Sequence, residues 1–143
     1  MNARFSVSVV VVFVLFIVTG YVVHGVLLEP FYKALPSLYR TPEDMQTHFP
    51  YMLPGHLVAA LAFVWLYFRM KQDQPPLREG GKFGFMIACL MIFPKFMFYY
   101  AVQPIPGAVT IRQIVFDTLS LVVIGIVVAY INRSKTARDH QSR

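Results

Sequence analysis

The sequence is poor in cysteine and in charge. Its one cysteine, Cys89, excludes an internal disulfide and a metal site made of several thiolates. Charged residues make up only 14% of the 143 residues, whereas hydrophobic residues make up 57%. A soluble domain of this length leaves much of its surface in water and cannot bury so large an apolar fraction. The composition therefore excludes a water-soluble fold and predicts a protein that lies in a lipid bilayer.

The motifs of soluble enzymes are missing as well. The chain has no P-loop, no GxGxxG, no HExxH, no GxSxG and no CxxC. Its net charge is +6, but no basic face is interleaved with stacking aromatic residues, which excludes nucleic acid as a partner. We therefore expect no enzyme and no catalytic residue. The expected partners are the lipid bilayer and either other membrane protein subunits or further copies of this chain.

Four apolar stretches are long enough to cross the ~30 Å hydrocarbon layer of a bilayer, which takes about 20 helical residues. They cover residues 5–28, 52–70, 83–102 and 109–131. The first is rich in Val and Ile, but an isolated strand cannot satisfy its backbone hydrogen bonds in lipid, so it too is expected to be a helix. The sequence therefore predicts an all-α polytopic membrane protein, with a single four-helix transmembrane bundle over residues 1–143.

Basic residues indicate the orientation of this bundle. They precede the first helix, lie between the second and third, and follow the fourth, whereas the segment 29–51 has more acidic than basic residues. By the positive-inside rule, both the N-terminus and the C-terminus are expected in the cytoplasm, with 29–51 outside. The basic residues on the cytoplasmic side are Arg4, Arg69, Lys71, Arg78, Lys82, Arg133, Lys135, Arg138 and Arg143.

The three connections between the helices differ in character. Residues 72–81 are rich in Pro and Gly and predict a solvated loop, and QPIPG at 103–107 predicts a tight turn that makes the last two helices a hairpin. The segment 29–51 carries several aromatic residues, and Thr41 followed by Pro42 is typical of a helix start. We expect this segment to be a short amphipathic element on the outer surface.

Two pairs of small residues favour close contacts between helices. Gly80 and Gly84 are four residues apart, as are Gly125 and Ala129. Small residues at this spacing allow two helix backbones to approach each other in a membrane.

Ionisable side chains gather in the outward half of the predicted bundle. Lys95 lies about 8 residues, or ~12 Å, inside the end of the third helix, and Asp117 lies equally far inside the start of the fourth. A charge within a membrane needs a partner, and the hairpin makes these two helices neighbours. We therefore predict an ion pair between Lys95 and Asp117 that faces the bundle interior, either as a structural pair or as a proton relay.

A second polar layer lies closer to the outer surface. His24 and His56 are each expected ~6 Å inside their helices, where they form hydrogen bonds between helices or share a metal ion or a b-haem. Whether any cofactor binds is open. Arg112 lies at a similar level and suits an interface anchor that extends toward water. The residues of this candidate ligand-binding pocket are His24, His56, Lys95, Tyr99, Gln103, Arg112 and Asp117.

The exit of the first helix, GYVVHGVLLEPFY at 20–32, followed by an outer segment and three more helices, resembles small four-helix inner-membrane proteins of bacteria that are known only as domains of unknown function. The resemblance covers most of the chain. It implies the inner membrane of a bacterium, and it supplies neither an activity nor a functional residue.

Three functions from different classes fit these observations. The first is a non-catalytic accessory or stabilising subunit of a larger membrane complex, which suits the small size and the lack of catalytic motifs. The second is binding or transport of a small anionic, quinone or lipid ligand that enters from the periplasmic side, which suits the cationic side chains of the pocket. The third is a b-haem or metal protein that uses His24 and His56.

Overall fold

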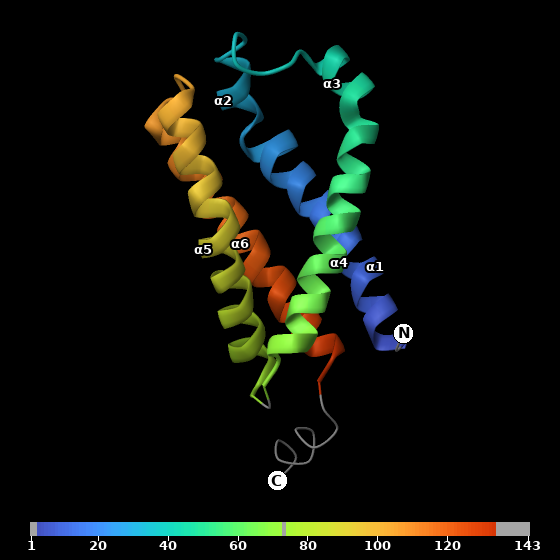
Figure 1. Cartoon of the computed structure of the whole chain (residues 1–143). Helices are drawn as coiled ribbons and strands as arrows, with labels where there is room; N and C mark the ends of the chain where they lie inside the picture. Colours follow the sequence, from blue (N-terminus) through green and yellow to red (C-terminus); the bar gives the residue numbers. More distant parts are fainter. Residues whose placement is uncertain (1–2, 73, 134–143) are drawn as a thin grey trace.

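The computed structural model describes residues 3–72 and 74–133, and within these ranges it has helices and no strand (Figure 1). The all-α prediction is confirmed. The predicted cytoplasmic C-terminal tail, residues 134–143, lies outside the described ranges. In chain order the elements are α1 (Ala3–Gly20), the π-helix η1 (Tyr21–Leu27), α2 (Glu29–Lys33), α3 (Pro42–His48), the 3-10 helix η2 (Phe49–Tyr51), α4 (Met52–Met70), α5 (Pro76–Val102) and α6 (Gly107–Ile131).

Four helical segments are long and apolar enough to cross a membrane, as predicted. They are Ala3–Leu27, Glu43–Met70, Pro76–Val102 and Gly107–Ile131. Many large apolar side chains on them are exposed, Leu90 at 69% among them, and such a surface suits hydrocarbon better than water. The segment between the first two long helices is helical at both of its ends, because α2 follows η1 and α3 continues through η2 into α4.

The two ends of the bundle carry different elements (Figure 1). Helices α2 and α3 and the turn between α5 and α6 lie at one end, which we call the α2–α3 end. The start of α1 and the connection between α4 and α5 lie at the other, which we call the N-terminal end. Helices α5 and α6 run side by side as a hairpin, as predicted, and α1 crosses α4.

The four long helices share one apolar core. Every one of them contributes buried side chains to it, and several aromatic rings meet there edge to face, as Phe63 does with Phe83 at 4.9 Å between ring centroids. Aromatic pairs of this geometry stabilise a core beyond the area that they bury. The core consists of Val9, Val12, Ala60, Phe63, Val64, Tyr67, Phe83, Ile87, Ala88, Leu121, Ile124, Val128 and Ala129.

The contact between α5 and α6 depends on glycine. A Cβ atom added to Gly80 would meet the carbonyl oxygen of Gly125, and one added to Gly84 would meet that of Leu121, both well inside van der Waals distance. The two backbones therefore touch, which confirms the predicted close contact at these glycines. Buried side chains on α5 continue at four-residue steps through Ala88 toward its far end.

The prediction of a solvated loop over 72–81 is wrong in its second half. Helix α5 begins at Pro76, seven residues before the predicted start at 83. Proline is favoured at the first helical position, and Glu79 in the first turn interacts favourably with the helix dipole. The two glycines at 80 and 81 favoured a loop in the prediction. In the structure Gly80 lies inside the helix, where its lack of a side chain allows the close contact with α6.

Candidate functional site

A chain of polar side chains links the middle of α6 to the α2–α3 end of the molecule. Its centre is His24, which lies in the π-helix η1. The backbone N–H of Leu28 donates to the carbonyl oxygen of Val23, five residues earlier, at 2.9 Å. A π-helical turn changes the direction in which the following side chains point, and such turns occur frequently at functional sites. His24 is therefore placed by an irregularity of the first long helix.

Both ring nitrogens of His24 have partners. Nε2 lies 3.1 Å from Oδ1 of Asp117 on α6, and Nδ1 lies 2.7 Å from the hydroxyl of Tyr32 on α2. The side chain of Asp117 is 14% exposed and that of His24 is 36% exposed, so the carboxylate is the more enclosed end of the pair. His24 thus joins two helices that are far apart in the sequence.

The chain continues from Tyr32 to Gln113. The Nε2 amide group of Gln113 donates to the hydroxyl oxygen of Tyr32 at 3.1 Å, and the ring of Tyr39 stacks on that of Tyr32 with 4.3 Å between centroids. Burial raises the pKa of Tyr32 to about 12, so its hydroxyl is protonated at neutral pH. Burial also raises the pKa of Tyr39, and the nearby amide of Gln113 partly opposes that rise.

The donors and acceptors of this chain agree on one direction. An ionised Asp117 only accepts, so the Nε2 atom of His24 carries a hydrogen and Nδ1 is left as an acceptor. Tyr32 donates its hydroxyl hydrogen to that Nδ1 atom, and its oxygen accepts from the amide of Gln113. Every contact then has one donor and one acceptor with His24 neutral. A proton on Nδ1 of His24 requires this contact to reverse, so that Tyr32 turns its hydroxyl hydrogen away and its oxygen accepts from the imidazole N–H.

The predicted ion pair between Lys95 and Asp117 is wrong. Asp117 pairs with His24, and no ion pair within residues 3–72 and 74–133 joins it to Lys95. Lys95 is exposed on α5, and its ammonium lies over the ring of Phe96 at 4.5 Å from the centroid. The prediction was right that Asp117 faces the interior and needs a partner, but it chose the wrong one.

The register of the hairpin explains this error. Gly80 on α5 contacts Gly125 on α6, and Gly84 contacts Leu121. One further step of four residues along each helix leads to Ala88 and Asp117. Lys95 lies seven residues, or ~10 Å, beyond Ala88 toward the α2–α3 end. Two more steps of four from Ala88 lead to Phe96, which is buried. Lys95 is the neighbour of Phe96, and neighbouring side chains in a helix point about 100° apart. Counting residues from the turn assumed a symmetric hairpin and gave neither the register nor the direction of the side chain.

His56 on α4 lies beside α1 at the level of Gly20, which is one helical turn before His24 in the sequence. Its ring meets that of Phe16 edge to face at 6.4 Å, and its Nδ1 atom lies 2.7 Å from the carbonyl oxygen of Met52. The Nε2 atom of His56 faces Gly20, and a Cβ atom added to that glycine would lie 3.9 Å from it. His24 and His56 therefore have separate partners. No three His, Cys, Asp or Glu side chains in the described part of the chain gather as metal ligands.

The other predicted pocket residues lie away from this chain. Arg112 is exposed, with its guanidinium over the ring of Phe31 at 4.2 Å. Tyr99 is exposed and meets Phe96 edge to face at 6.2 Å. Gln103 ends α5, where its backbone N–H donates to the carbonyl oxygen of Tyr99 at 2.9 Å. The predicted pocket is therefore divided: Asp117 and His24 belong together, and its two cationic side chains, on Lys95 and Arg112, lie outside.

Sequence reasoning missed two tyrosines and one glutamine. Tyr32 and Tyr39 lie in the segment that was expected to be an amphipathic element on the outer surface, and Gln113 is not among the residues of the predicted pocket. A usable signal was the eight-residue distance from His24 to Tyr32 across the end of the first long helix, which brings a hydroxyl close to a histidine. The π-helix that makes this contact possible has no sequence signature that we recognise.

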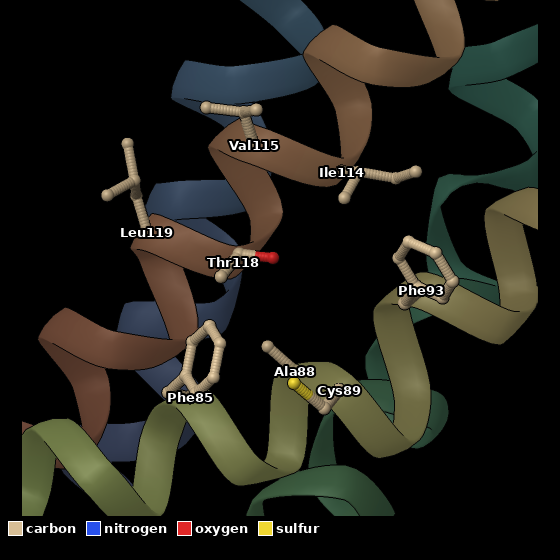
Figure 2. A pocket seen from close by; sticks show the side chains of 8 residues that line it. All are labelled: Phe85, Ala88, Cys89, Phe93, Ile114, Val115, Thr118 and Leu119. Atoms are coloured by element: carbon tan, nitrogen blue, oxygen red, sulfur yellow. The ribbon is translucent and has the colours of Figure 1, made fainter.

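A separate apolar groove lies between α5 and α6, with a volume of about 310 Å³. Figure 2 shows the hydroxyl of Thr118 pointing into it, whereas Asp117, the preceding residue, points to His24. None of the polar chain lines this groove, so the two features are independent. The groove is lined by Phe85, Ala88, Cys89, Phe93, Ile114, Val115, Thr118 and Leu119.

No known protein family, curated protein or solved structure matches this chain.

Proposed function

We propose that this protein is an integral membrane protein that binds and releases a proton at the chain of Asp117, His24 and Tyr32. The observation that carries the proposal is the unbroken hydrogen-bonded series from a carboxylate to a surface segment, at 3.1 and 2.7 Å. Asp117 lies about 10 residues, or ~15 Å, from the start of α6, which is close to the middle of that 25-residue helix. A carboxylate at such a depth in a bilayer suits proton binding.

Within residues 3–72 and 74–133, the hydrogen-bonded series runs from Asp117 toward the α2–α3 end and not toward the N-terminal end. On the other side of Asp117 the bundle core is aliphatic and aromatic as far as Ser8 and Asn132, which are joined by a hydrogen bond at 2.8 Å. A proton that reaches Asp117 through Tyr32 and His24 is therefore held there and returns by the same route. This suits a protonation site that senses or supplies protons, and it does not suit a channel through the bilayer.

The membrane setting of the proposal follows the charge distribution. The inner membrane of a bacterium is the setting that the resemblance of the sequence implies. We place the N-terminus and the C-terminus in the cytoplasm, because basic residues flank the N-terminal end. The α2–α3 end then faces the periplasm, and the proton exchanges with that side. A reporter fused to the C-terminus tests this orientation, because it is active in the cytoplasm only if the assignment is right.

Infrared difference spectroscopy tests the proton site itself. We expect the spectrum of the lipid-embedded protein at low minus high pH to contain the carboxylic acid band of a protonated Asp117, and we expect Asp117→Asn to lack that band. Lys95→Met is the matched control. Lys95 was the partner of Asp117 predicted from the sequence, and its replacement should leave the band unchanged. A band that responds to Lys95→Met and not to replacement of His24 would reject the proposed site.

Lys95 favours an accessory-subunit role for the same protein. Its charge is exposed on a long apolar helix, ~10 Å inside the end of α5, and a charge facing hydrocarbon is unfavourable. A carboxylate on a partner subunit would compensate it. Size-exclusion chromatography in mild detergent should show a co-migrating membrane protein with the wild type and lose it with Lys95→Met. Lys33→Met is the control, because Lys33 already pairs with Glu29 at 2.9 Å.

A further inference from the structure

Two cationic side chains in the first turns of α5 have no partner within the described part of the chain. Arg78 and Lys82 are four residues apart, so they lie on one face of the helix, and both are exposed. Within residues 3–72 and 74–133, neither side chain forms an ion pair, a hydrogen bond or a cation–π contact. Arg69 at the end of α4, by contrast, lies over the ring of Trp65 at 5.3 Å. Arg78 and Lys82 are therefore available to an anion from outside the chain.

The acidic side chain beside these two cations is engaged elsewhere. Glu79 follows Arg78 directly in the sequence. Its Oε1 atom accepts from the hydroxyl of Tyr67 at 2.9 Å and from the backbone N–H of Gln72 at 3.1 Å. Tyr67 lies on α4, and Gln72 follows the end of that helix. The carboxylate of Glu79 therefore faces α4 and leaves Arg78 and Lys82 to another anion.

The face of α5 that carries the two cations continues into the apolar groove between α5 and α6. Phe85 lies three residues after Lys82, and the groove extends from it through Cys89 to Phe93 in steps of four. On α5 the groove is eight residues, or ~12 Å, long. Its volume of about 310 Å³ is near the lower limit for ligand sites in proteins. Positive charge at one end and a long apolar surface beyond it suit an amphipathic anion.

One polar atom lies inside this groove. The hydroxyl of Thr118 points into it (Figure 2) and forms no hydrogen bond within the described residues. A hydroxyl in the middle of a helix often bonds to the carbonyl oxygen four residues earlier. Thr19 and Ser120 do so here, at 2.7 and 2.9 Å. Thr118 departs from this pattern, so its hydroxyl can donate to an acceptor in the groove.

We propose that this face binds an anionic phospholipid of the bilayer, with the phosphate at Arg78 and Lys82 and one acyl chain in the groove. Arg and Lys are the side chains that bind phosphate, and each basic residue near a membrane surface favours anionic lipid. The ester carbonyl between the phosphate and the acyl chain accepts from Thr118. In the proposed orientation this end of α5 lies at the cytoplasmic leaflet, whose anionic lipids give it a negative surface potential.

The cations beyond the other end of the groove are less suited to hold the phosphate. Lys95 and Arg112 lie toward the α2–α3 end. Each is already over an aromatic ring, Lys95 over Phe96 at 4.5 Å and Arg112 over Phe31 at 4.2 Å. The lipid is therefore expected with its headgroup toward the N-terminal end of the molecule.

Photolabelling tests the site with a phosphatidylglycerol that carries a diazirine in its acyl chain. The probe is added at limiting concentration to the full chain in mild detergent, and the labelled peptides are identified by mass spectrometry. We expect the label in the segments that line the groove, residues 85–93 and 114–119. Phosphatidylcholine with the same diazirine chain should label these segments at least about tenfold less, because its headgroup has no net negative charge.

A pair of double variants separates this site from the general charge of the molecule. Arg78→Gln combined with Lys82→Gln should lower the labelling by phosphatidylglycerol at least about tenfold, because both cations that hold the phosphate are lost. Arg69→Gln combined with Lys71→Gln is the matched control. It removes two cations near the end of α4 and should leave the labelling unchanged. Both variants replace exposed side chains and are expected to fold.

The phospholipid site rests on the membrane setting of the proposed function but shares no residue with the proton site. The infrared band of Asp117 should therefore persist in the variant without Arg78 and Lys82. Equal labelling of the groove by the two lipids would overturn the proposal, since any surrounding lipid would then fill it. Labelling that survives the loss of Arg78 and Lys82 would also overturn it. So would labelling that is lost with Lys95→Met instead, because the headgroup would then lie at the α2–α3 end.

Discussion

At the N-terminal end of this molecule, α1, α4, α5 and α6 pack aliphatic and aromatic side chains against one another, and α5 touches α6 backbone to backbone. At the α2–α3 end, side-chain hydrogen bonds connect the helices: His24 bonds to Asp117 and to Tyr32, and Gln113 donates to Tyr32. The first end resembles the core of any helical bundle. The second holds a carboxylate, an imidazole and a phenol in series.

This difference separates stability from function. Apolar packing is insensitive to pH and leaves no group free to react, whereas a polar network changes with each proton that it gains or loses. We infer that the N-terminal end supplies most of the free energy of folding and that the α2–α3 end supplies the chemistry. Substitutions at the two ends should therefore differ in size and in pH dependence.

The largest effect is expected at the N-terminal end. Gly84→Ala places a methyl group against the backbone of α6 at Leu121 and Val122, which cannot move without separating the hairpin. We expect a loss of about 3 kcal/mol in the free energy of unfolding, measured by denaturation in detergent. Gly81→Ala is the control, because its Cβ would have no neighbour within 4 Å. Alanine there should stabilise α5 by about 0.5–1 kcal/mol through helix propensity. Equal effects at both glycines would refute the close contact.

A smaller effect is expected in the polar chain. We predict a coupling of about 1 kcal/mol between His24 and Asp117 in a double-mutant cycle with His24→Phe and Asp117→Asn, a typical size for a hydrogen bond between membrane helices. The matched cycle with Lys95→Met and Asp117→Asn should be additive within about 0.5 kcal/mol, because these residues do not meet. Coupling in the Lys95 cycle and additivity in the His24 cycle would restore the ion pair predicted from the sequence.

The smallest effect is the alkaline response of the α2–α3 end. The pKa of Tyr32 is raised by burial from 10.0 to about 12. A raised pKa contributes stability that is complete below about pH 10 and is lost as the pH rises to about 12. Because Tyr32 is only half-buried, we expect a loss of less than about 1 kcal/mol rather than the full value for two pKa units. Tyr32→Phe should remove this part of the alkaline loss. An unchanged alkaline profile in that variant would show that Tyr32 remains accessible in the folded protein.

Much of the architecture could be predicted because it follows from local properties of the sequence. Apolar length predicted four helices, with the bounds of the second correct at 52–70, and the prolines at 103–107 predicted the hairpin. The start of α5 was missed because Gly80 and Gly81 usually mark loops. Here the packing of Gly80 against α6 outweighs that local preference.

The candidate site could be predicted only in part. Depth along a helix is countable, so Asp117 was correctly recognised as a buried charge that needs a partner. The partner itself depends on helix register and on the direction of the side chain, which residue counting does not provide. The π-helix turns His24 toward Asp117, and Tyr32 reaches His24 from a short helix outside the predicted spans. Both depend on tertiary packing that no local pattern encodes.

The most direct test of the central claim asks whether Tyr32 acts on Asp117 through His24. The pH midpoint of the Asp117 carboxyl band is measured by infrared spectroscopy in the wild type, Tyr32→Phe, His24→Phe and the double variant. If the three groups form one chain, Tyr32→Phe shifts the midpoint when His24 is present and leaves it unchanged in the His24→Phe background. An equal shift in both backgrounds, or no shift in either, would contradict a proton path through His24.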